Sequence, residues 1–453
     1  MWGYRKYLYH SYNDVEVLII IKKDNNRAPK GAFNFLYKEE IIMKISGVDV
    51  RDLKKEYGTP LYIYDAAHLK NNMRLFKNNF KSSKFETEVL FASKAFNVKE
   101  MVRTVAAEGL SLDCVSVGEF FTALSVGFDP KKVYFHGNNK TPEELRFIIT
   151  HNVGTIVVDN LMELVALDMI CKELKKPVNI IIRLNVGISA HTHKFIVTAH
   201  IDSKFGVGYE SEDYKTMMEV IEKSEYINFL GFHSHIGSQI FDLKAFEAAL
   251  EKLISYCKDY KEPLVLNIGG GFGVKYTDDD KPIPFDVVSK TLIETCENAL
   301  KKNNVSIKKL CIEPGRSIVG EAGYTLYTVG FTKKTPNKEY YFIDGGMTDN
   351  IRPALYQAKY DCDIVGKENE KRDHKVTIAG KCCESGDLII EDYDLPAAQP
   401  GDLLITYTTG AYGYSMSSNY NKALTPAVVF VEDGKSKLAV RRMTLDELIE
   451  REE

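Results

Sequence analysis

A lysine at the end of a short apolar run is the first residue of this chain whose type and position could do chemistry. The run Glu88–Asn97 reads EVLFASKAFN and brings Lys94 to the carboxyl end of a predicted strand. A buried amine is costly unless it is used, and an amine so placed can form a Schiff base with a carbonyl cofactor. For this segment alone, a surface lysine is the alternative. Asn97 and Glu100 predict a capped helix start directly after it.

Two loops offer a place for an anion. Gly269, Gly270 and Gly271 follow a predicted strand and can expose several backbone N–H groups. The segment Glu313–Ser317 (EPGRS) follows another strand and supplies a carboxylate, a tight turn and a guanidinium. Each loop taken singly could be a structural turn. Together they follow the last two of eight predicted strands, which is the usual phosphate site of a barrel enzyme.

A pair of histidines completes the set of candidate site residues. His233 and His235 stand two residues apart in HSHIGS, and His191 and His193 form a similar pair. Metal binding is one interpretation, but no set of ligands at suggestive spacing completes an open metal site, and we predict none. An imidazole stacked on a flat ligand, with Ser238 on a phosphate, fits better. A Schiff-base lysine, a phosphate cradle, an imidazole and a carboxylate are together what pyridoxal phosphate needs.

Eight apolar or β-branched runs must position these residues, and helix-like segments such as Lys99–Glu108 lie between them. This alternation predicts an α/β protein with a (β/α)8 TIM barrel. An open doubly wound sheet is the alternative, because counting strands cannot prove closure. Polar residues at the ends of all eight runs favour the barrel. The runs are 89–93, 112–116, 132–137, 155–159, 179–185, 231–237, 264–268 and 309–313.

The predicted organisation has four parts. Residues 1–42 form an N-terminal extension of unknown role that carries no chemistry. Residues 43–64 supply strands that join a second domain, and residues 65–315 form the cofactor-binding barrel. Residues 316–453 hold strand-like runs joined by turns rich in Gly, Pro, Asn and Asp, which predicts a C-terminal β domain of sandwich or barrel type.

Composition narrows the function class. The 453 residues are 44% hydrophobic and 27% charged, which is typical of a soluble globular protein. The net charge of −4 gives no reason to expect nucleic acid. The apolar run Val17–Ile21 is too short for a membrane span or a signal peptide. The eight cysteines form no CxxC pair, so we expect free thiols and a cytoplasmic location.

From about Tyr57 to Ala427 the chain resembles the barrel-type (fold type III) pyridoxal-phosphate decarboxylases, in the branch that acts on diaminopimelate. The resemblance implies pyridoxal 5'-phosphate as cofactor and a homodimer with active sites shared across the interface. It also implies conversion of meso-2,6-diaminopimelate into L-lysine and CO2. The matching motifs are FASKAFN, LDCVSVGE, FHGNNK, AHTHKF, DSKFGV, HSHIGSQ, NIGGGFG, EPGRSIVG, DNIRPALY, CESGD and GAYGYSMSSNYN.

The resemblance also implies residue roles. Lys94 carries the cofactor, His235 stacks on its ring, Glu313 pairs with the pyridine nitrogen, and Cys383 of the partner subunit protonates the substrate carbon. The further cofactor-binding residues are Asp113, Arg183, Ser238, Gly269, Gly270, Gly271, Gly315, Arg316 and Tyr412. The substrate-binding residues are Arg316, Arg352, Tyr356, Glu384 and Tyr412.

Substrate choice can be argued from charge. Two arginines and a tyrosine can bind a second carboxylate, and Glu384 can take an ammonium group. Ornithine and lysine end in a bare ammonium, which the arginines would repel. A related decarboxylase of ornithine, lysine, arginine or carboxynorspermidine is the first alternative. A non-catalytic regulatory homologue is the second, and the presence of both Lys94 and Cys383 argues against it. An extra thiol, Cys382, is expected to point to the other side of an extended segment.

Overall fold

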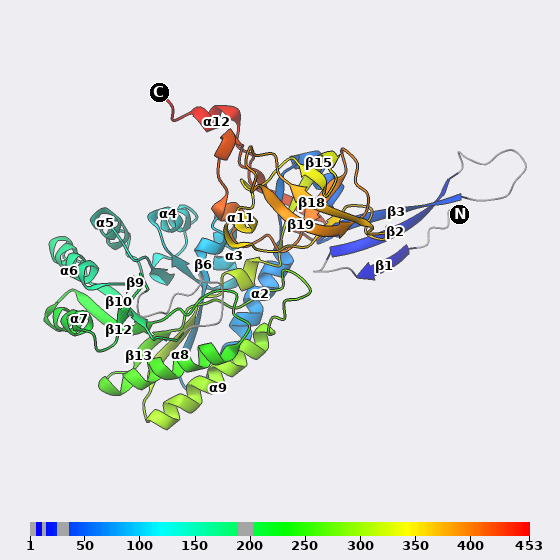
Figure 1. The fold of residues 1–453 in the computed structure, drawn as a ribbon. Coiled ribbons are helices and arrows are strands. Elements are labelled where there is room, and N and C mark those ends of the chain that lie inside the picture. The colour runs from blue at the N-terminus through cyan, green and yellow to red at the C-terminus, as the bar shows by residue number, and fades with distance from the viewer. Residues whose placement is uncertain (1–5, 11–14, 25–35, 189–202) are drawn as a thin grey trace, which may run out of the picture. The chain divides into compact units, whose positions relative to one another are not determined.

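The computed structural model describes residues 6–10, 15–24, 36–188 and 203–453. The chain forms two compact units. The barrel unit comprises Lys70–Lys275 and Asp279–Val319. The β unit comprises the described residues of Met1–Leu69, together with Tyr276–Asp278 and Gly320–Glu453. Figure 1 shows the ribbon with its elements labelled.

Eight parallel strands close the barrel unit. They pair in the order β10-β12-β13-β14-β6-β7-β8-β9, and β9 pairs back with β10. This ring confirms the predicted TIM barrel and excludes the open sheet, which would leave two edge strands. A short strand, β11 (Val207–Gly208), adds to β10. The barrel strands are β6 (Glu86–Ala92), β7 (Ser111–Cys114), β8 (Val133–Phe135), β9 (Thr155–Val158), β10 (Val178–Asn185), β12 (Ile227–His233), β13 (Leu264–Asn267) and β14 (Ile307–Ile312).

Side chains fill the barrel interior. One cluster takes a residue from each of seven strands, as expected for a layer inside a closed barrel. Two positions before Leu90, on the same face of β6, Glu88 accepts hydrogen bonds from Lys309, Ser111 and Tyr134. The interior is therefore a packed core that holds the strands in register. The cluster contains Leu90, Tyr134, Val157, Ile181, Leu230, Val265 and Cys311.

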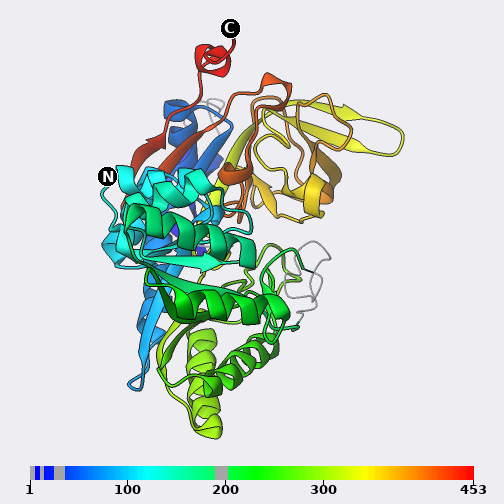
Figure 2. The ribbon, with the colours of Figure 1, turned by 90° about the vertical axis from the view of Figure 1, so that its left-hand side faces the viewer.

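Helices cover the outside of the strands (Figure 1 and Figure 2). Thr141 and Glu144 form a capping box at the start of the helix Pro142–Thr150. The predicted cap at Asn97 is wrong, because a 3-10 turn at Ser93–Ala95 delays the helix, which begins at Lys99 with Val98 as N-cap. The helices are α3 (Lys99–Glu108), α4 (Val117–Ser125), α5 (Pro142–Thr150), α6 (Leu161–Leu174), α7 (Glu212–Lys223), α8 (Leu243–Tyr256), α9 (Phe285–Asn303) and α10 (Arg316–Val319).

The β unit is built around β5 (Leu61–Asp65). This strand runs antiparallel to β15 (Gly323–Lys334) and parallel to β21 (Ala427–Glu432). The segment before the barrel therefore pairs with the C-terminal strands, as predicted. The mixed sheet has the order β19-β18-β16-β15-β5-β21-β22, with β17 and β20 beside it. The other strands are β16 (Glu339–Ile343), β17 (Cys362–Ile364), β18 (His374–Ala379), β19 (Leu388–Leu395), β20 (Leu403–Thr406) and β22 (Lys435–Val440).

The N-terminal strands form a sheet of their own. Its order is β1-β2-β3-β4, and the long antiparallel pair β2 and β3 is plain in Figure 1. Met43 and Ile45 at the end of β3 are buried in the core that also holds Leu61 and Ile63 of β5. The segment directly after the predicted extension is therefore part of the β unit's core. The elements are β1 (Lys6–His10), β2 (Val15–Asp24), β3 (Leu36–Ile45) and β4 (Val48–Asp49), followed by α1 (Val50–Tyr57) and α2 (Ala66–Asn79).

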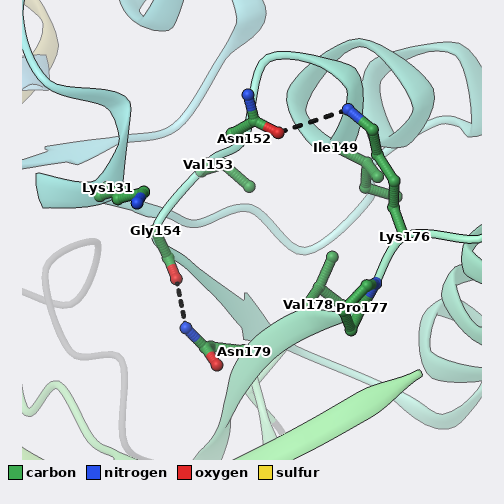
Figure 3. A pocket seen from close by; sticks show the side chains of 9 residues that line it. All are labelled: Lys131, Ile149, Asn152, Val153, Gly154, Lys176, Pro177, Val178 and Asn179. Atoms are coloured by element: carbon green, nitrogen blue, oxygen red, sulfur yellow. Dashed lines mark hydrogen bonds between the residues drawn. The ribbon is translucent and has the colours of Figure 1, made fainter. Parts of the chain in front are cut away.

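A cavity of about 420 Å³ lies at the amino end of the barrel (Figure 3). Val153 and Gly154 in its lining directly precede β9, and Lys176 and Pro177 directly precede β10. Gly154 O accepts a hydrogen bond from Asn179 Nδ2 at 3.1 Å. Active sites of such barrels lie at the opposite, carboxyl end, so this cavity belongs to the structural face. In the part of the chain that the structure describes, no helix is both long and apolar enough to span a membrane.

A buried ion pair ties the loop after β8 to α6. Lys140 Nζ donates to Gly137 O at 2.6 Å, to Val157 O at 2.7 Å and to Glu163 Oε1 at 2.7 Å. The two side chains are only 2% and 3% exposed. The three N–H groups of the ammonium are thus all satisfied, which offsets the cost of burying its charge.

We expect Lys140→Met to lower the free energy of unfolding by about 3–5 kcal/mol, because it leaves Glu163 buried without its counter-charge. Urea unfolding followed by circular dichroism measures this. Lys215→Met, which removes an exposed ion pair with Glu212, is the matched control and should leave stability unchanged. Adding Glu163→Leu to Lys140→Met should recover part of the loss. Equal losses of stability in Lys140→Met and Lys215→Met would contradict the stabilising role of the buried pair.

Candidate active site

The barrel unit brings most of the predicted site residues to one edge, which we call the carboxyl rim. Lys94 lies in the turn directly after β6, with its side chain exposed. Asp113 lies on β7, Arg183 on β10, and Glu313 directly follows β14. The charge of Lys94 lowers the pKa of both Asp113 and His235, so its amine lies near both side chains.

Glu313 is the most heavily contacted carboxylate of the rim. Asn267 Nδ2 donates to its Oε1 at 2.7 Å, and His233 Nε2 lies 3.3 Å from its Oε2. His136 Nε2 lies 2.9 Å from Oε1 and 3.7 Å from Asp113 Oδ1. All five side chains are buried. Their arrangement places one imidazole between two carboxylates.

The pKa values of this group follow from burial and charge. Burial would raise the pKa of Glu313, but His136 and His233 outweigh it and hold that pKa well below 4.5. Burial raises the pKa of Asp113 to about 6, against the opposing effect of His136. Burial lowers the pKa of His233 to about 4, and it lowers that of His235 well below 6.5, with help from Lys94 and Arg183. Glu313 is therefore ionised at neutral pH, and both of these histidines are neutral.

The glycines of the predicted anion loop are demanded by close backbone approach. A Cβ on Gly270 would lie 2.0 Å from Glu313 O, and one on Gly271, where φ is +110°, would lie 2.3 Å from Gly237 O. A Cβ on Gly269 would meet His235 Nδ1 at 2.6 Å. The loop after β13 is thus packed directly against the loops after β12 and β14, which forms a backbone cradle.

Two further contacts join the loops after β12 and β14 to each other and the loop after β14 to the end of β6. Arg316 Nη2 donates to Ser238 Oγ at 3.0 Å, and a Cβ on Gly315 would lie 2.9 Å from that of Ala92. Within the described residues, the buried Asp113 Oδ1 and Ser317 Oγ lack a hydrogen-bond partner. Buried polar atoms are normally satisfied, so the rim suits a polar ligand. A cradle, an amine and an ionised carboxylate fit pyridoxal phosphate.

A metal ion is a less suitable occupant. Ligand atoms of His136, His233 and Glu313 lie within 4.8 Å of one another, close enough to hold one. However, the histidine nitrogens that face Glu313 are placed to present protons or positive charge to its oxygens. The carboxylate therefore already has its counter-groups.

The other predicted site residues lie in the β unit. Arg352 begins α11 (Arg352–Tyr356) and is buried. Its Nη1 donates to Tyr360 Oη, and its guanidinium lies 5.0 Å from the ring centroid of Tyr276 and 5.9 Å from that of Tyr412. Aromatic faces stabilise a buried cation. No carboxylate among the described residues forms an ion pair with Arg352, so its charge is available to an anionic ligand.

The two adjacent thiols differ in exposure. Cys383 is exposed and Cys382 is half-buried. The expected extended segment is wrong, since the chain bends at residues 381–383 after β18 ends. The backbone N–H of Cys382 donates to Asp387 Oδ2, and that of Cys383 donates to Asn421 Oδ1, both at 2.8 Å. Bending, not strand alternation, therefore separates the two side chains. Glu384 is also exposed, and Tyr356 and Tyr412 are half-buried.

Sequence reasoning missed three residues of the rim. His136 and Asn267 were not proposed at all, and His233 was considered only as a metal ligand. Each follows or ends a barrel strand, so the rule that found the other polar strand ends could have found them. Their partner Glu313 comes from a different strand, and no local pattern indicates that pairing.

The closed barrel and the groups at its carboxyl rim indicate the class to which this protein belongs. The family model "Pyridoxal-dependent decarboxylase, pyridoxal binding domain" matches residues 66–320. The chain is therefore a pyridoxal-phosphate-dependent decarboxylase of the barrel type.

Relatives narrow the assignment. Diaminopimelate decarboxylase of Bacillus subtilis (strain 168) is 46% identical over 90% of this chain and 94% of its own length. The enzyme of that name from Staphylococcus aureus (strain COL) is 41% identical over 91% and 98%. The crystal structure of diaminopimelate decarboxylase from M. jannaschii with L-lysine has a TM-score of 0.85 and 31% identity, covering 96% of this chain and 97% of that one. The chain belongs to the diaminopimelate decarboxylase family.

We expect Gly270→Ala to weaken the binding of pyridoxal phosphate by about 10- to 100-fold, because the added Cβ forces the cradle away from Glu313 O. Absorbance titration of the cofactor-free protein measures this. Gly118→Ala is the control, since its Cβ would meet Ser116 Oγ at an ordinary 3.7 Å. An unchanged affinity of Gly270→Ala for pyridoxal phosphate would show that the cradle does not bind the cofactor.

Proposed function

We propose that this chain converts meso-2,6-diaminopimelate into L-lysine and CO2, the last step of lysine biosynthesis, with the site residues named below. The observation that carries the choice of substrate is the buried guanidinium of Arg352, which has aromatic partners and no carboxylate of its own among the described residues. A buried cation of this kind favours a ligand that brings a carboxylate. Diaminopimelate has a second amino-acid group and does so.

The groups at the rim support a place for the cofactor. Lys94 would hold the carbonyl carbon, His235 would lie on the ring face, and Glu313 would face the pyridine nitrogen. Asp113 and Arg183 would support the cofactor from the strand ends. When bound, pyridoxal phosphate withdraws the electron pair that the departing CO2 leaves on the substrate. The residues that would hold its phosphate are Ser238, Gly269, Gly270, Gly271, Gly315, Arg316 and Tyr412.

The chain's own groups then act on the substrate. Cys383 offers an exposed thiol, which would deliver a proton to the substrate carbon. Glu384 would bind the distal ammonium, and Arg316 and Arg352 the distal carboxylate, with Tyr356 and Tyr412 beside them. The relative from M. jannaschii was crystallised with L-lysine, which supports lysine as the product here.

We further propose a cytoplasmic homodimer whose active sites combine residues of both subunits. The exposed positions of Cys383 and Glu384 support this arrangement, because both side chains are free to reach a second copy. All eight cysteines are free thiols, as suits a reducing compartment.

We expect diaminopimelate to exceed L-ornithine, L-lysine, L-arginine and carboxynorspermidine in kcat/KM by at least about 100-fold, because each of these would leave the arginines without a carboxylate. CO2 release at matched concentrations measures this. Lys94→Ala should abolish turnover, and borohydride should no longer fix the cofactor to the chain. Faster turnover of L-ornithine would overturn the choice of substrate, and wild-type turnover by Lys94→Ala would overturn the mechanism.

Mixed dimers test the sharing of sites. Lys94→Ala and Cys383→Ala should each be inactive, but mixing them with subunit exchange should restore about one quarter of the parent activity. The reason is that half of the dimers are hybrids, and each hybrid has one site with both native residues. A mixture of Lys94→Ala with the double variant Lys94→Ala/Cys383→Ala is the control and should stay inactive. If the first mixture also stays inactive while sedimentation shows hybrids, the sites are not shared.

A further inference from the structure

His136 occupies an unusual electrostatic position. It follows β8 directly, it is 5% exposed, and its Nε2 lies 2.9 Å from Glu313 Oε1 and 3.7 Å from Asp113 Oδ1. The contact with Glu313 is not aligned as a hydrogen bond and the contact with Asp113 is too long for one, so Nε2 has no hydrogen-bond partner among the described residues. The imidazole nitrogen is nevertheless placed between two carboxylates.

The surrounding groups favour a charged His136. Burial lowers its pKa, but Asp113 and Glu313 more than compensate and raise it above 6.5, against a smaller opposing effect of Arg183. Its neighbour His233, whose ring centroid is 4.9 Å away, has its pKa lowered to about 4 and is neutral. Of these two imidazoles on Glu313, His136 is the one whose pKa the neighbouring carboxylates raise.

The contacts of Glu313 are divided unequally between its oxygens. Oε1 faces Asn267 Nδ2 and His136 Nε2, whereas Oε2 faces only His233 Nε2 among the described residues, and at a longer 3.3 Å. The two groups that face Oε1 thus hold the carboxylate in place. Oε2 keeps acceptor capacity for a further donor.

We propose that His136 is a positioning residue whose imidazolium keeps Glu313 ionised and oriented, so that the proton shared with the cofactor's pyridine nitrogen stays on the nitrogen. This inference rests on the proposed function, which assigns Glu313 to that nitrogen. A carboxylate with a lower pKa competes less for a shared proton. A ring that keeps this proton is the better electron sink.

The experiment uses the holoenzyme loaded with pyridoxal phosphate labelled with 15N in the ring. In His136→Gln and His136→Phe, the 15N resonance should move toward that of an unprotonated pyridine. The kcat should fall about tenfold for each unit by which a substitution lowers the pKa of the pyridine nitrogen, while KM for diaminopimelate stays within about twofold. His151→Gln, at an exposed histidine after α5, is the control and should change none of these values.

Glu313→Gln distinguishes a wrong assignment of the cofactor site from a wrong role for His136. If Glu313→Gln leaves the 15N resonance in place, Glu313 is not the partner of the ring nitrogen, and the proposed site assignment fails. If Glu313→Gln moves the resonance but the His136 variants do not, only the role of His136 is overturned. A loss of stability in those variants without a 15N shift likewise shows a merely structural residue.

A measurement on the unsubstituted protein makes the test independent of how the variants fold. The 13C and 15N resonances of the His136 ring in the holoenzyme should be those of an imidazolium at neutral pH. A neutral ring there would overturn the proposal.

Discussion

Closure of the parallel barrel is the constraint on which the active site depends. The pairing of β9 with β10 completes a ring in which all eight strands end at one rim. A residue that ends a strand is thereby brought near residues far away in the sequence, as with Lys94 and Glu313. The packed interior, from Glu88 at its base to the layer around Leu90, prevents the ring from opening or slipping. The side chains at the rim are thus held in position by a packed core that lies below them.

Electrostatics at the rim follows from burying several charges together. In a medium of low dielectric, a carboxylate keeps its charge only if it is surrounded by donors and positive groups. Glu313 has Asn267, His136 and His233, whereas Asp113 shares His136 at a longer distance and has its pKa raised to about 6. The same environment therefore separates two carboxyl groups into one that is firmly ionised and one that titrates near neutrality. Such differences are a common property of catalytic sites.

The β unit buries a cation without an ion-pair partner among the described residues. The guanidinium of Arg352 lies among Tyr276, Tyr360 and Tyr412, whose ring faces and hydroxyl groups stabilise it. A carboxylate of the protein in that place would neutralise Arg352 permanently. The aromatic partners stabilise the guanidinium and leave its charge unneutralised among the described residues.

The sequence by itself determined the strand and helix rhythm, because periodicity and turn residues act over a few neighbours. It favoured the barrel over an open sheet, but closure was decided by the pairing of β9 with β10. It also predicted Lys94, the glycine loop and Glu313 as site residues, since each stands at a strand end in a recognisable motif. It misplaced the helix start at Asn97, where the turn at Ser93–Ala95 displaces the cap. Only the tertiary structure decided that His136 and Asn267 hold Glu313 and that Tyr276 and Tyr360 surround Arg352. These are contacts between distant segments, and their geometry exists only once closure and packing have brought the segments together.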